Sequence, residues 1–385
     1  MAAGKNCSMK AVRKVTQKGY KHVVKPVLFK RKPDSVHKHM IKMAKLVGNV
    51  PGVRSLPKLW SYQNEKYLEQ TVGGLLIRNP VGLSAGFDKG IETPRIMRAV
   101  GFGFMTGGSV TWGQYKGNEG DWFFRLPKTQ SLVVNAGLPS EGTEVIVHRV
   151  SKYPGAVFHK FPLVVSVAKT NSERTANDTD GIRDYAASMA MFDAESNVAA
   201  MEINISCPNA FGGEAFTTPE RLEALLSTVD ALALAKPIFI KMPISLSKEQ
   251  FLALTDVAAA HRITGLTIGN LRKDRQNVQL KDELPQGVNG NLSGAPNREI
   301  STDLVRETYR RHGKKMILIG VGGIFTAEHA YEKIRAGATL TEMITGVIFE
   351  GPQVVGEINA GLVELLKRDG YSNISEAIGV DADKD

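Results

Sequence analysis

A cysteine stands where a predicted strand gives way to a loop, in the stretch EINISCPNA at residues 202–210. Residues 202–205 alternate polar and apolar side chains, which predicts the end of a strand, and Pro208 cannot continue its hydrogen-bond ladder. In a barrel of alternating strands and helices, catalytic side chains lie at this end of the strands. Cys207 is therefore our candidate catalytic residue, a proton acceptor or donor beside a cofactor, with a small buried hydrophobic residue as the alternative.

Lysines and asparagines follow several other predicted strands. Lysine is rarely buried without a partner, so lysines at strand ends predict a cluster that contacts an anionic ligand or a delocalised negative charge. Asparagine amides would serve a planar heterocycle as donors and acceptors, although any single one could instead satisfy the backbone of a loop. The lysines are Lys89, Lys169 and Lys241, and the asparagines are Asn204, Asn209 and Asn270.

Glycines follow the last two apolar runs, in IGVGGIF and MITGVIFEGP. Such glycines let backbone N–H groups turn toward an anion, and a phosphate site formed after strands seven and eight recurs in barrels. The candidates are Gly322, Gly323, Thr345 and Gly346. A lone glycine pair is more often a tight turn, but two such loops in this order favour a phosphate. No GxGxxG opens a βαβ unit, so a mononucleotide fits better than a dinucleotide.

Eight short apolar runs after about residue 70 must position these side chains, and helical patterns lie between several of them. This repetition predicts an α/β fold, a (β/α)8 TIM barrel. A doubly wound sheet would use similar units, but the polar residue at so many strand ends favours the barrel. The runs are NPVGLSAGF, FGFMTGGSV, PLVVSVAK, AAMEINIS, PIFIKMP, GLTIGN, MILIGVGG and LTEMITGVIF.

The composition is that of an ordinary globular protein, with 385 residues, 42% hydrophobic and 23% charged. This length accommodates one large α/β domain and a smaller appendage. Two cysteines, Cys7 and Cys207, cannot form a disulfide framework, which favours a reducing compartment. Neither cysteine is paired with histidines at metal-ligand spacing, and we expect no metal site. We see no Ser-His-Asp arrangement.

The basic charge of the chain belongs to its first 60 residues. These hold fifteen Lys and Arg against one acidic residue, Asp34, so about +14 of charge lies here and about −4 in the remainder of a chain with net charge +10. Such a segment indicates anionic lipid, nucleic acid or a solvated tail. No run of eighteen apolar residues predicts a membrane span, and no apolar core predicts a secretory signal.

We expect residues 1 to about 24 to be disordered or a loose helix. From Ser35 onward an amphipathic helix is predicted, because apolar residues recur near helical spacing with lysines between them. These apolar residues are Val36, Met40, Met43 and Val47. Gly48 and Pro51 end this helix, and a linker follows. The expected domains are residues 1–60, a basic extension, and residues 61–385, the barrel.

Together these residues resemble the dihydroorotate dehydrogenase family, FMN-containing TIM barrels of pyrimidine biosynthesis, from about residue 26 to residue 371. NPVGLSAGFDKG, NISCPN, GNLSGAP, GVGGI and TGVIFEGP carry the resemblance and are specific in combination. By position, the resemblance implies an FMN site formed by Ser84, Ala85, Gly86, Lys89, Gly108, Ser109, Asn204, Lys241, Gly269, Ser293, Gly294, Gly322, Gly323, Thr345 and Gly346. It implies substrate contacts from Lys89, Asn135, Asn204, Asn209 and Asn270.

The resemblance gives Cys207 the role of the base. In this family a base removes the C5 proton of dihydroorotate while hydride leaves C6 for flavin N5; the base is cysteine in soluble class 1 enzymes and usually serine in membrane-associated class 2 enzymes. The segment FKRKPDSVHKHM is, however, similar to the class 2 segment that lines a quinone tunnel. This similarity places His37 at the tunnel, and Arg125 of FFRLP matches a second tunnel residue. The chain thus resembles class 2 with a class 1-like base.

The resemblance implies oxidation of dihydroorotate to orotate in UMP biosynthesis, with electrons passed to a membrane quinone. It also implies a peripheral protein on the cytoplasmic face of a bacterial inner membrane, or on the mitochondrial inner membrane in a eukaryote. The basic N-terminus would then meet an anionic membrane surface, and no nucleic acid partner is expected. The alternatives are a dihydroorotate dehydrogenase with a soluble acceptor such as fumarate, and a degenerate barrel that binds a phosphorylated ligand without redox chemistry.

Four features depart from the family pattern. A substrate-contacting asparagine aligns to Val134, with Asn135 one position late, and the threonine after the strand-six asparagine is Leu271. Ser166 replaces a flavin-contacting asparagine of the third strand. Ile344 replaces the aromatic residue that class 2 places before the Thr-Gly of the last strand. The first two departures concern orotate, and the others concern the flavin and the quinone route.

Overall fold

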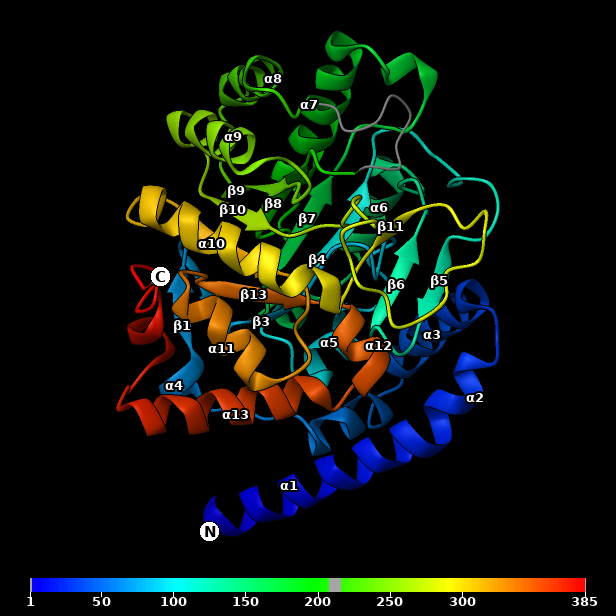
Figure 1. Ribbon diagram of the computed structural model, residues 1–385, viewed down its shortest axis with the longest axis vertical. Coiled ribbons are helices and arrows are strands. Elements are labelled where there is room, and N and C mark those ends of the chain that lie inside the picture. The colour runs from blue at the N-terminus through cyan, green and yellow to red at the C-terminus, as the bar shows by residue number, and fades with distance from the viewer. Residues whose placement is uncertain (1, 208–215, 385) are drawn as a thin grey trace.

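Eight parallel strands close into a barrel in the order β10-β12-β13-β3-β4-β7-β8-β9 (Figure 1). The computed structural model describes residues 2–207 and 216–384, with the backbone alone for residues 2–8. Each of the eight predicted apolar runs supplies one strand, which confirms the TIM barrel. The strands are β3 (Val81–Leu83), β4 (Phe104–Val110), β7 (Leu163–Val167), β8 (Ala200–Asn204), β9 (Ile238–Met242), β10 (Gly265–Ile268), β12 (Ile317–Val321) and β13 (Leu340–Met343).

Helices cover the outside of the barrel, and a large apolar cluster fills the space between the two layers. Several helices begin with a side chain that caps the first turn, such as Ser247 before α9 and Thr326 before α11. The helices are α5 (Pro94–Val100), α6 (Thr143–Ser151), α7 (Asp178–Ala194), α8 (Pro219–Ala231), α9 (Lys248–Ala260), α10 (Arg298–His312), α11 (Ala327–Arg335), α12 (Thr345–Glu350) and α13 (Val354–Asp369). Short helical turns are α4 (Glu65–Leu68), η3 (Gly155–Val157), η4 (Glu173–Thr175), η5 (Ala295–Asn297) and η6 (Ile374–Ala377).

The interior of the barrel has an apolar floor and a polar middle. The hairpin of β1 (Gln70–Val72) and β2 (Leu75–Ile77) packs on the first inward residues of the strands. Because alternate residues of a strand share a face, the residues two positions further along also point inward. The floor contains Phe104, Val164, Ala200, Phe239, Ile319 and Leu340. The next layer contains Thr106, Ser166, Glu202, Lys241, Thr267 and Glu342, all buried.

A small antiparallel sheet stands beside the mouth of the barrel. It consists of β5 (Phe123–Leu126), β6 (Ser131–Val134) and β11 (Asn291–Leu292), in the order β11-β6-β5. The segments that follow β4 and β10 supply its strands. Residues from two distant loops are thereby held over one end of the barrel.

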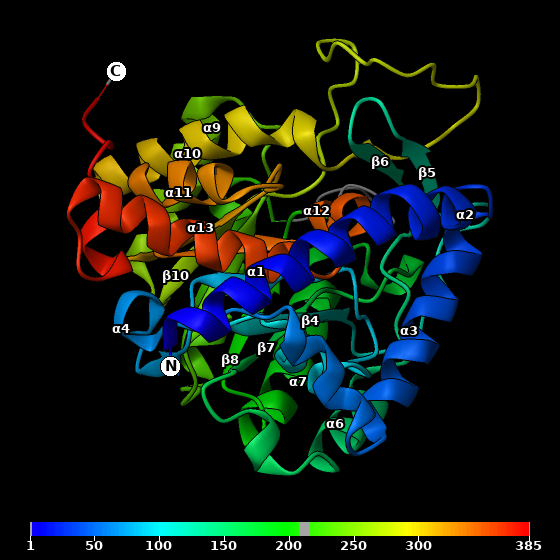
Figure 2. The same ribbon diagram turned by 90° about the horizontal axis from the view of Figure 1, so that it is seen from below.

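The N-terminal residues form a chain of helices: α1 (Ala2–Gly19), the π-helical turn η1 (Tyr20–Val24), α2 (Lys25–Phe29), α3 (Pro33–Asn49) and the 3-10 turn η2 (Val53–Leu59). Figures 1 and 2 both show α1 beside α13. Of our two expectations for residues up to 24, disorder was wrong and a helix is confirmed. The side chain of Gln17 bonds to Glu357 of α13, and Lys21 pairs with Glu350 of α12, so contacts with the barrel helices stabilise a segment without clear periodicity. The amphipathic helix from Ser35 is confirmed as α3.

Candidate functional site: a cavity from the barrel mouth to the N-terminal helices

One cavity of about 450 Å³ extends from the carboxyl ends of the barrel strands to the N-terminal helices. The apolar residues predicted on the amphipathic helix line it. On the barrel side its wall includes Ala85, Gly86, Lys89, Ser109, Asn204, Cys207, Lys241, Asn270, Ser293 and Thr345. On the helical side its wall includes Tyr20, Phe29, Val36, His37, Met40, Met43 and Val47. The structure therefore brings the candidate base, flavin and quinone residues to a single space.

Cys207 and Lys89 lie at the barrel end of this cavity. The Lys89 ammonium donates to the backbone oxygen of Gly86 at 2.9 Å and lies 5.6 Å from the centre of the Phe123 ring. Burial lowers the pKa of Lys89 to about 8, while the charges of Asp88, Cys207 and Asp34 oppose this shift. The charges of a thiolate at Cys207 and of the Lys89 ammonium would therefore attract each other across the mouth.

A network of amides and hydroxyls joins three strand ends next to Cys207. Asn204 Nδ2 donates to Ser109 Oγ at 2.7 Å, and Asn204 Oδ1 accepts from the backbone N–H of Ser206 at 3.1 Å. Asn270 Nδ2 donates to the backbone oxygen of Ser206 at 2.7 Å. Ser166, the residue that departs from the family asparagine, shares a hydrogen bond of 2.9 Å with Ser109. These contacts fix the two candidate substrate amides, Asn204 and Asn270, on neighbouring sides of the loop that carries Cys207.

Lys241 lies within the barrel below this network. It is 5% exposed, and its ammonium donates to Ser84 Oγ at 3.3 Å. Ser84 follows β3 and Lys241 belongs to β9, so two of the candidate flavin residues meet from well-separated strands.

The candidate phosphate residues gather where β11, β12 and α12 meet. Ser293 Oγ lies 3.0 Å from Thr345 Oγ1, and a Cβ added at Gly294 would lie only 2.8 Å from Thr345 Cγ2. A Cβ at Gly323 would lie 2.4 Å from Arg298 Cβ, where φ is +68°, so this close approach requires glycine. Gly322 packs on the same first turn of α10, and Gly346 packs on the backbone of Ile324. Glycines and hydroxyls from several loops thus lie close together in one region.

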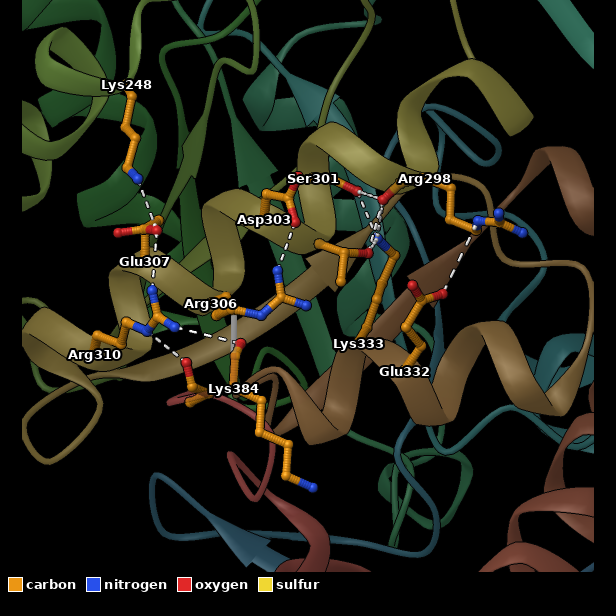
Figure 3. Close-up of polar contacts among 12 residues, drawn as sticks. Lys248, Arg298, Ser301, Asp303, Arg306, Glu307, Arg310, Glu332, Lys333 and Lys384 are labelled. Carbon is orange, nitrogen blue, oxygen red and sulfur yellow. Dashed lines mark hydrogen bonds and ion pairs between the residues drawn. The ribbon is translucent and has the colours of Figure 1, made fainter.

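Lys333 supports this region from behind (Figure 3). The side chain belongs to α11, is fully buried, and donates to Ser301 Oγ at 2.6 Å, Thr302 Oγ1 at 2.9 Å and the backbone oxygen of Arg298 at 3.2 Å. Burial lowers its pKa to about 7. Because Gly322 and Gly323 rest on Asn297 and Arg298, Lys333 ties α11 to the first turn of α10 that holds the glycine loop in place.

His37 and Arg125 lie on the helical side of the cavity. The ring of His37 lies 5.6 Å from both the Phe87 and Phe123 rings, and burial, followed by Lys89 and Lys38, lowers the pKa of His37 to about 3. Its imidazole is therefore neutral at physiological pH. Arg125 Nη1 donates to the backbone oxygen of Arg31 at 2.7 Å, and burial lowers the pKa of Arg125.

Some candidate residues lie elsewhere. Asn135 does not line the cavity, because its Oδ1 accepts from Asn118 Nδ2 at 3.2 Å; Val134 lines it instead. Lys169 donates to the backbone oxygen of Thr175 at 3.0 Å and is not part of the lysine cluster that we expected. Gly108 and Gly269 pack on the backbone of neighbouring strands. Asn209 lies outside the described residues. The departures Leu271 and Ile344 both line the cavity.

Sequence reasoning missed Tyr20, Phe29 and Phe123, which line the cavity. Scattered aromatic residues carry no spacing signal that marks a cavity wall. It also missed Glu342, which is fully buried inside the barrel. A glutamate within the apolar run LTEMITGVIF was a usable signal, because a charged residue is almost never fully buried without a partner.

Residues 67–366 match a family model described as dihydroorotate dehydrogenase. A dihydroorotate dehydrogenase (quinone) from Anaeromyxobacter dehalogenans is 36% identical over 312 residues, which cover 80% of this chain and 84% of the relative. Another from Deinococcus deserti is 33% identical over 374 residues, with 94% of this chain and 100% of the relative covered. The solved structure of DHODH from Eimeria tenella in complex with ferulenol has a TM-score of 0.80 at 25% identity and covers 92% of this chain and 98% of that chain.

Proposed function

The chain belongs to the dihydroorotate dehydrogenase family, and we propose that it oxidises dihydroorotate to orotate with FMN and passes the electrons to a membrane quinone. The observation that carries this proposal is the single cavity that joins Cys207 and Lys241 to His37 and Arg125. A substrate that reacts at the barrel mouth and an apolar acceptor that enters between the N-terminal helices would share one space.

The residues at the barrel mouth fit a flavin mononucleotide. Gly294, Gly323 and Thr345 would border the single phosphate, because glycine loops at this end of a barrel let backbone N–H groups turn toward an anion. Lys241 would lie beside the ring, where a buried cation stabilises negative charge. When bound, FMN supplies the acceptor for the hydride from C6 of dihydroorotate. The chain itself would orient the ring through Lys241 and the residues of the barrel mouth.

Cys207 would remove the C5 proton of the substrate. Its thiol lies in the cavity near the Lys89 ammonium, and a neighbouring cation favours the thiolate form. Asn204 and Asn270 would hold the substrate amides in place from the two sides of the same loop. The Lys89 ammonium would also attract the carboxylate of the substrate.

The N-terminal helices would carry the quinone route and the contact with the membrane, and we propose residues 1–60 as a unit with this role and residues 61–385 as the catalytic barrel. Val36, Met40 and Met43 line the cavity beside neutral His37. Large apolar side chains on the outside of the same helices are exposed, among them Val15, Val23, Val27, Leu46, Leu56 and Leu59. Together with the lysines they suit an anionic membrane surface.

Among the described residues no helix has the length and apolarity needed to span a bilayer. The proposed location is therefore a peripheral one, on the cytoplasmic face of a bacterial inner membrane or on the mitochondrial inner membrane.

A soluble acceptor such as fumarate is the second candidate, and the cysteine at the base position favours it. The test is to purify the full chain, measure its flavin content, and compare turnover of dihydroorotate with a quinone and with fumarate in parallel. We expect a yellow protein and faster turnover with quinone. Turnover with fumarate alone would support the second candidate, and a colourless protein that still binds a phosphorylated ligand would indicate a barrel without redox chemistry.

A further inference from the structure

The middle layer of the barrel contains three buried ionisable groups: Glu202, Lys241 and Glu342. They are 1%, 5% and 0% exposed, respectively. Branched apolar residues usually fill this layer of a TIM barrel, and charged groups are costly to bury unless they are paired. The proposed role of Lys241 beside the flavin does not explain why two glutamates are buried in the same layer.

The two glutamates approach each other from opposite sides of the barrel. Their strands β8 and β13 are four places apart in the closed ring of eight, and both side chains point inward. The charge of Glu202 acts directly on Glu342. Glu202 Oε1 and Glu342 Oε2 are both buried and, within the described chain, have no hydrogen-bond partner. Two interacting carboxylates that each keep a buried oxygen without a donor are the arrangement that one shared proton would satisfy.

Among the described residues, the other groups that act on Glu342 are Lys241 and two hydroxyls, those of Thr106 and Ser84. Thr106 of β4 donates to Glu342 Oε1 at 2.5 Å, and the Ser84 hydroxyl that follows β3 lowers the pKa of this carboxyl. Ser166 of β7 and Thr267 of β10 complete the layer with hydroxyl groups. The charged groups that act on this carboxylate are thus Glu202 and Lys241.

One added proton would make the net charge of this layer zero. Two carboxylates and one ammonium would leave one uncompensated negative charge in the interior, whereas one added proton makes the layer neutral. Like charges that share a buried site ionise one at a time. In agreement, burial, followed by the charge of Glu202, raises the pKa of Glu342 to about 7, against the opposing effects of Lys241, Thr106 and Ser84.

The charge of Lys241 connects this pair to the candidate flavin site. Lys241 acts directly on Glu342, and its ammonium also donates to Ser84 Oγ at 3.3 Å. The charge on the glutamate pair therefore acts on the ammonium that we place beside the flavin. We propose that Glu202 and Glu342 hold a single proton between them, and that the one negative charge left on the pair keeps Lys241 cationic beside the flavin. The second half of this proposal rests on the proposed function, and the first half does not.

Infrared spectroscopy of the full-length protein tests the shared proton directly. A buried protonated carboxyl gives a carbonyl band that moves in heavy water and disappears on deprotonation. We expect this band in the wild type at pH 6, its loss as the pH rises through about 7, and its loss at pH 6 in both Glu202→Gln and Glu342→Gln. Glu299→Gln, which changes an exposed glutamate, should keep it. A wild type without the band at pH 6, or a Glu202→Gln variant that keeps it, would overturn the shared proton.

The flavin midpoint potential tests the link to Lys241. Each single variant leaves one carboxylate for Lys241, as the protonated pair does, so its potential at pH 6 should match that of the wild type. Above pH 7 the wild-type pair loses its proton, and its potential should fall more steeply with pH than that of Glu342→Gln. Parallel curves would refute the link. A protein without bound flavin would instead refute the proposed function and leave the infrared result standing.

Discussion

The guanidinium of Arg125 lies 4.6 Å from the centre of the Phe29 ring, and it donates to the backbone oxygen of Arg31 at 2.7 Å. These contacts join β5, which stands beside the barrel mouth, to α2 and the turn that follows it. Both side chains line the cavity. Arg125 therefore holds together two parts of the cavity wall that are more than ninety residues apart in the chain.

We predict that Arg125→Ala and His37→Ala lower turnover with quinone and leave turnover with a small soluble dye close to that of the wild type. The arginine variant would lose a hydrogen bond from the charged Arg125 to the quinone, and such a loss costs about 1.5–3 kcal/mol. KM for quinone should therefore rise by about 10- to 100-fold in this variant. Because the pKa of His37 is about 3, quinone turnover should show no titration of His37 between pH 5 and 8.

The matched control is Lys42→Ala, which changes an exposed side chain of α3. Equal losses with quinone and with dye would show that His37 and Arg125 support the fold of the site instead of the acceptor route.

Cys207→Ala should keep FMN and lose most turnover, because the loss of a general base typically costs about 10² to 10⁴ in rate. Cys207→Ser should retain partial activity with its pH optimum moved upward, since a hydroxyl is a much weaker acid than a thiol. The measurement is kcat against pH together with flavin content. Cys7→Ala serves as the control for the loss of a thiol. An alanine variant with near wild-type turnover would remove Cys207 from the proposed role.

Lys241→Ala should weaken or abolish flavin binding and slow reduction by dihydroorotate, because it removes the buried ammonium proposed beside the ring. Lys169→Ala is a matched control: this lysine also follows a barrel strand, but it lies outside the cavity and bonds to the backbone of Thr175. The measurement is the flavin content of both purified variants. Full occupancy with an unchanged reduction rate in Lys241→Ala would contradict the assignment.

The barrel was readable from the sequence because each strand is a local signal, an apolar run that ends in glycine or a polar residue. The strand ends also indicated where the cavity lies, since Cys207 follows β8, Lys241 is near the end of β9, and both line the cavity. Contacts between distant segments were not readable. Residues up to about 24 lack clear periodicity, and their helices are held in part by two distant pairs, Gln17 with Glu357 and Lys21 with Glu350. These partners are 340 and 329 positions apart in the chain.

The burial of Lys333 could not be predicted from the sequence for a related reason. Lys333 lies in a helix with charged neighbours, which is the pattern of an exposed face, yet it is fully buried against α10. Its partners Ser301 and Thr302 come from another helix, and no local pattern links the three residues. Asn135 illustrates the opposite error, since its position next to a family motif suggested the cavity while Asn118 binds its side chain elsewhere.

Lys333→Met should change how stability depends on pH. The pKa of Lys333 is about 7 in the folded protein, against 10.5 for an ordinary lysine, so between these values the unfolded chain binds more protons and the wild type gains stability as pH rises. The full gain is on the order of 4–5 kcal/mol. Methionine keeps much of the side-chain volume without a charge, so this part of the pH dependence should vanish.

The measurement is the free energy of unfolding in urea at several pH values from 7 to 10, for the wild type, Lys333→Met and the exposed control Lys314→Met. Only Lys333→Met should show a smaller rise with pH than the wild type. Three parallel curves would mean that the folded protein holds Lys333 with an ordinary pKa.

The exposed apolar side chains of the N-terminal helices should bind the protein to anionic membranes. Leu46 of α3 and Leu56 of η2 are 67% and 53% exposed and do not line the cavity, so their replacement by glutamate leaves its wall intact. We expect the wild type to co-sediment with anionic liposomes and to dissociate as salt is raised, because each lysine near such a surface contributes about 1 kcal/mol that salt screens. The double variant Leu46→Glu with Leu56→Glu should bind weakly at any salt concentration. It should also lose turnover with quinone in liposomes, while turnover with a soluble dye persists.

The control pair Leu76→Glu with Val145→Glu changes apolar residues that are 40% and 46% exposed on β2 and α6, and it should bind like the wild type. Equal binding by both pairs would place the membrane contact on another part of the protein.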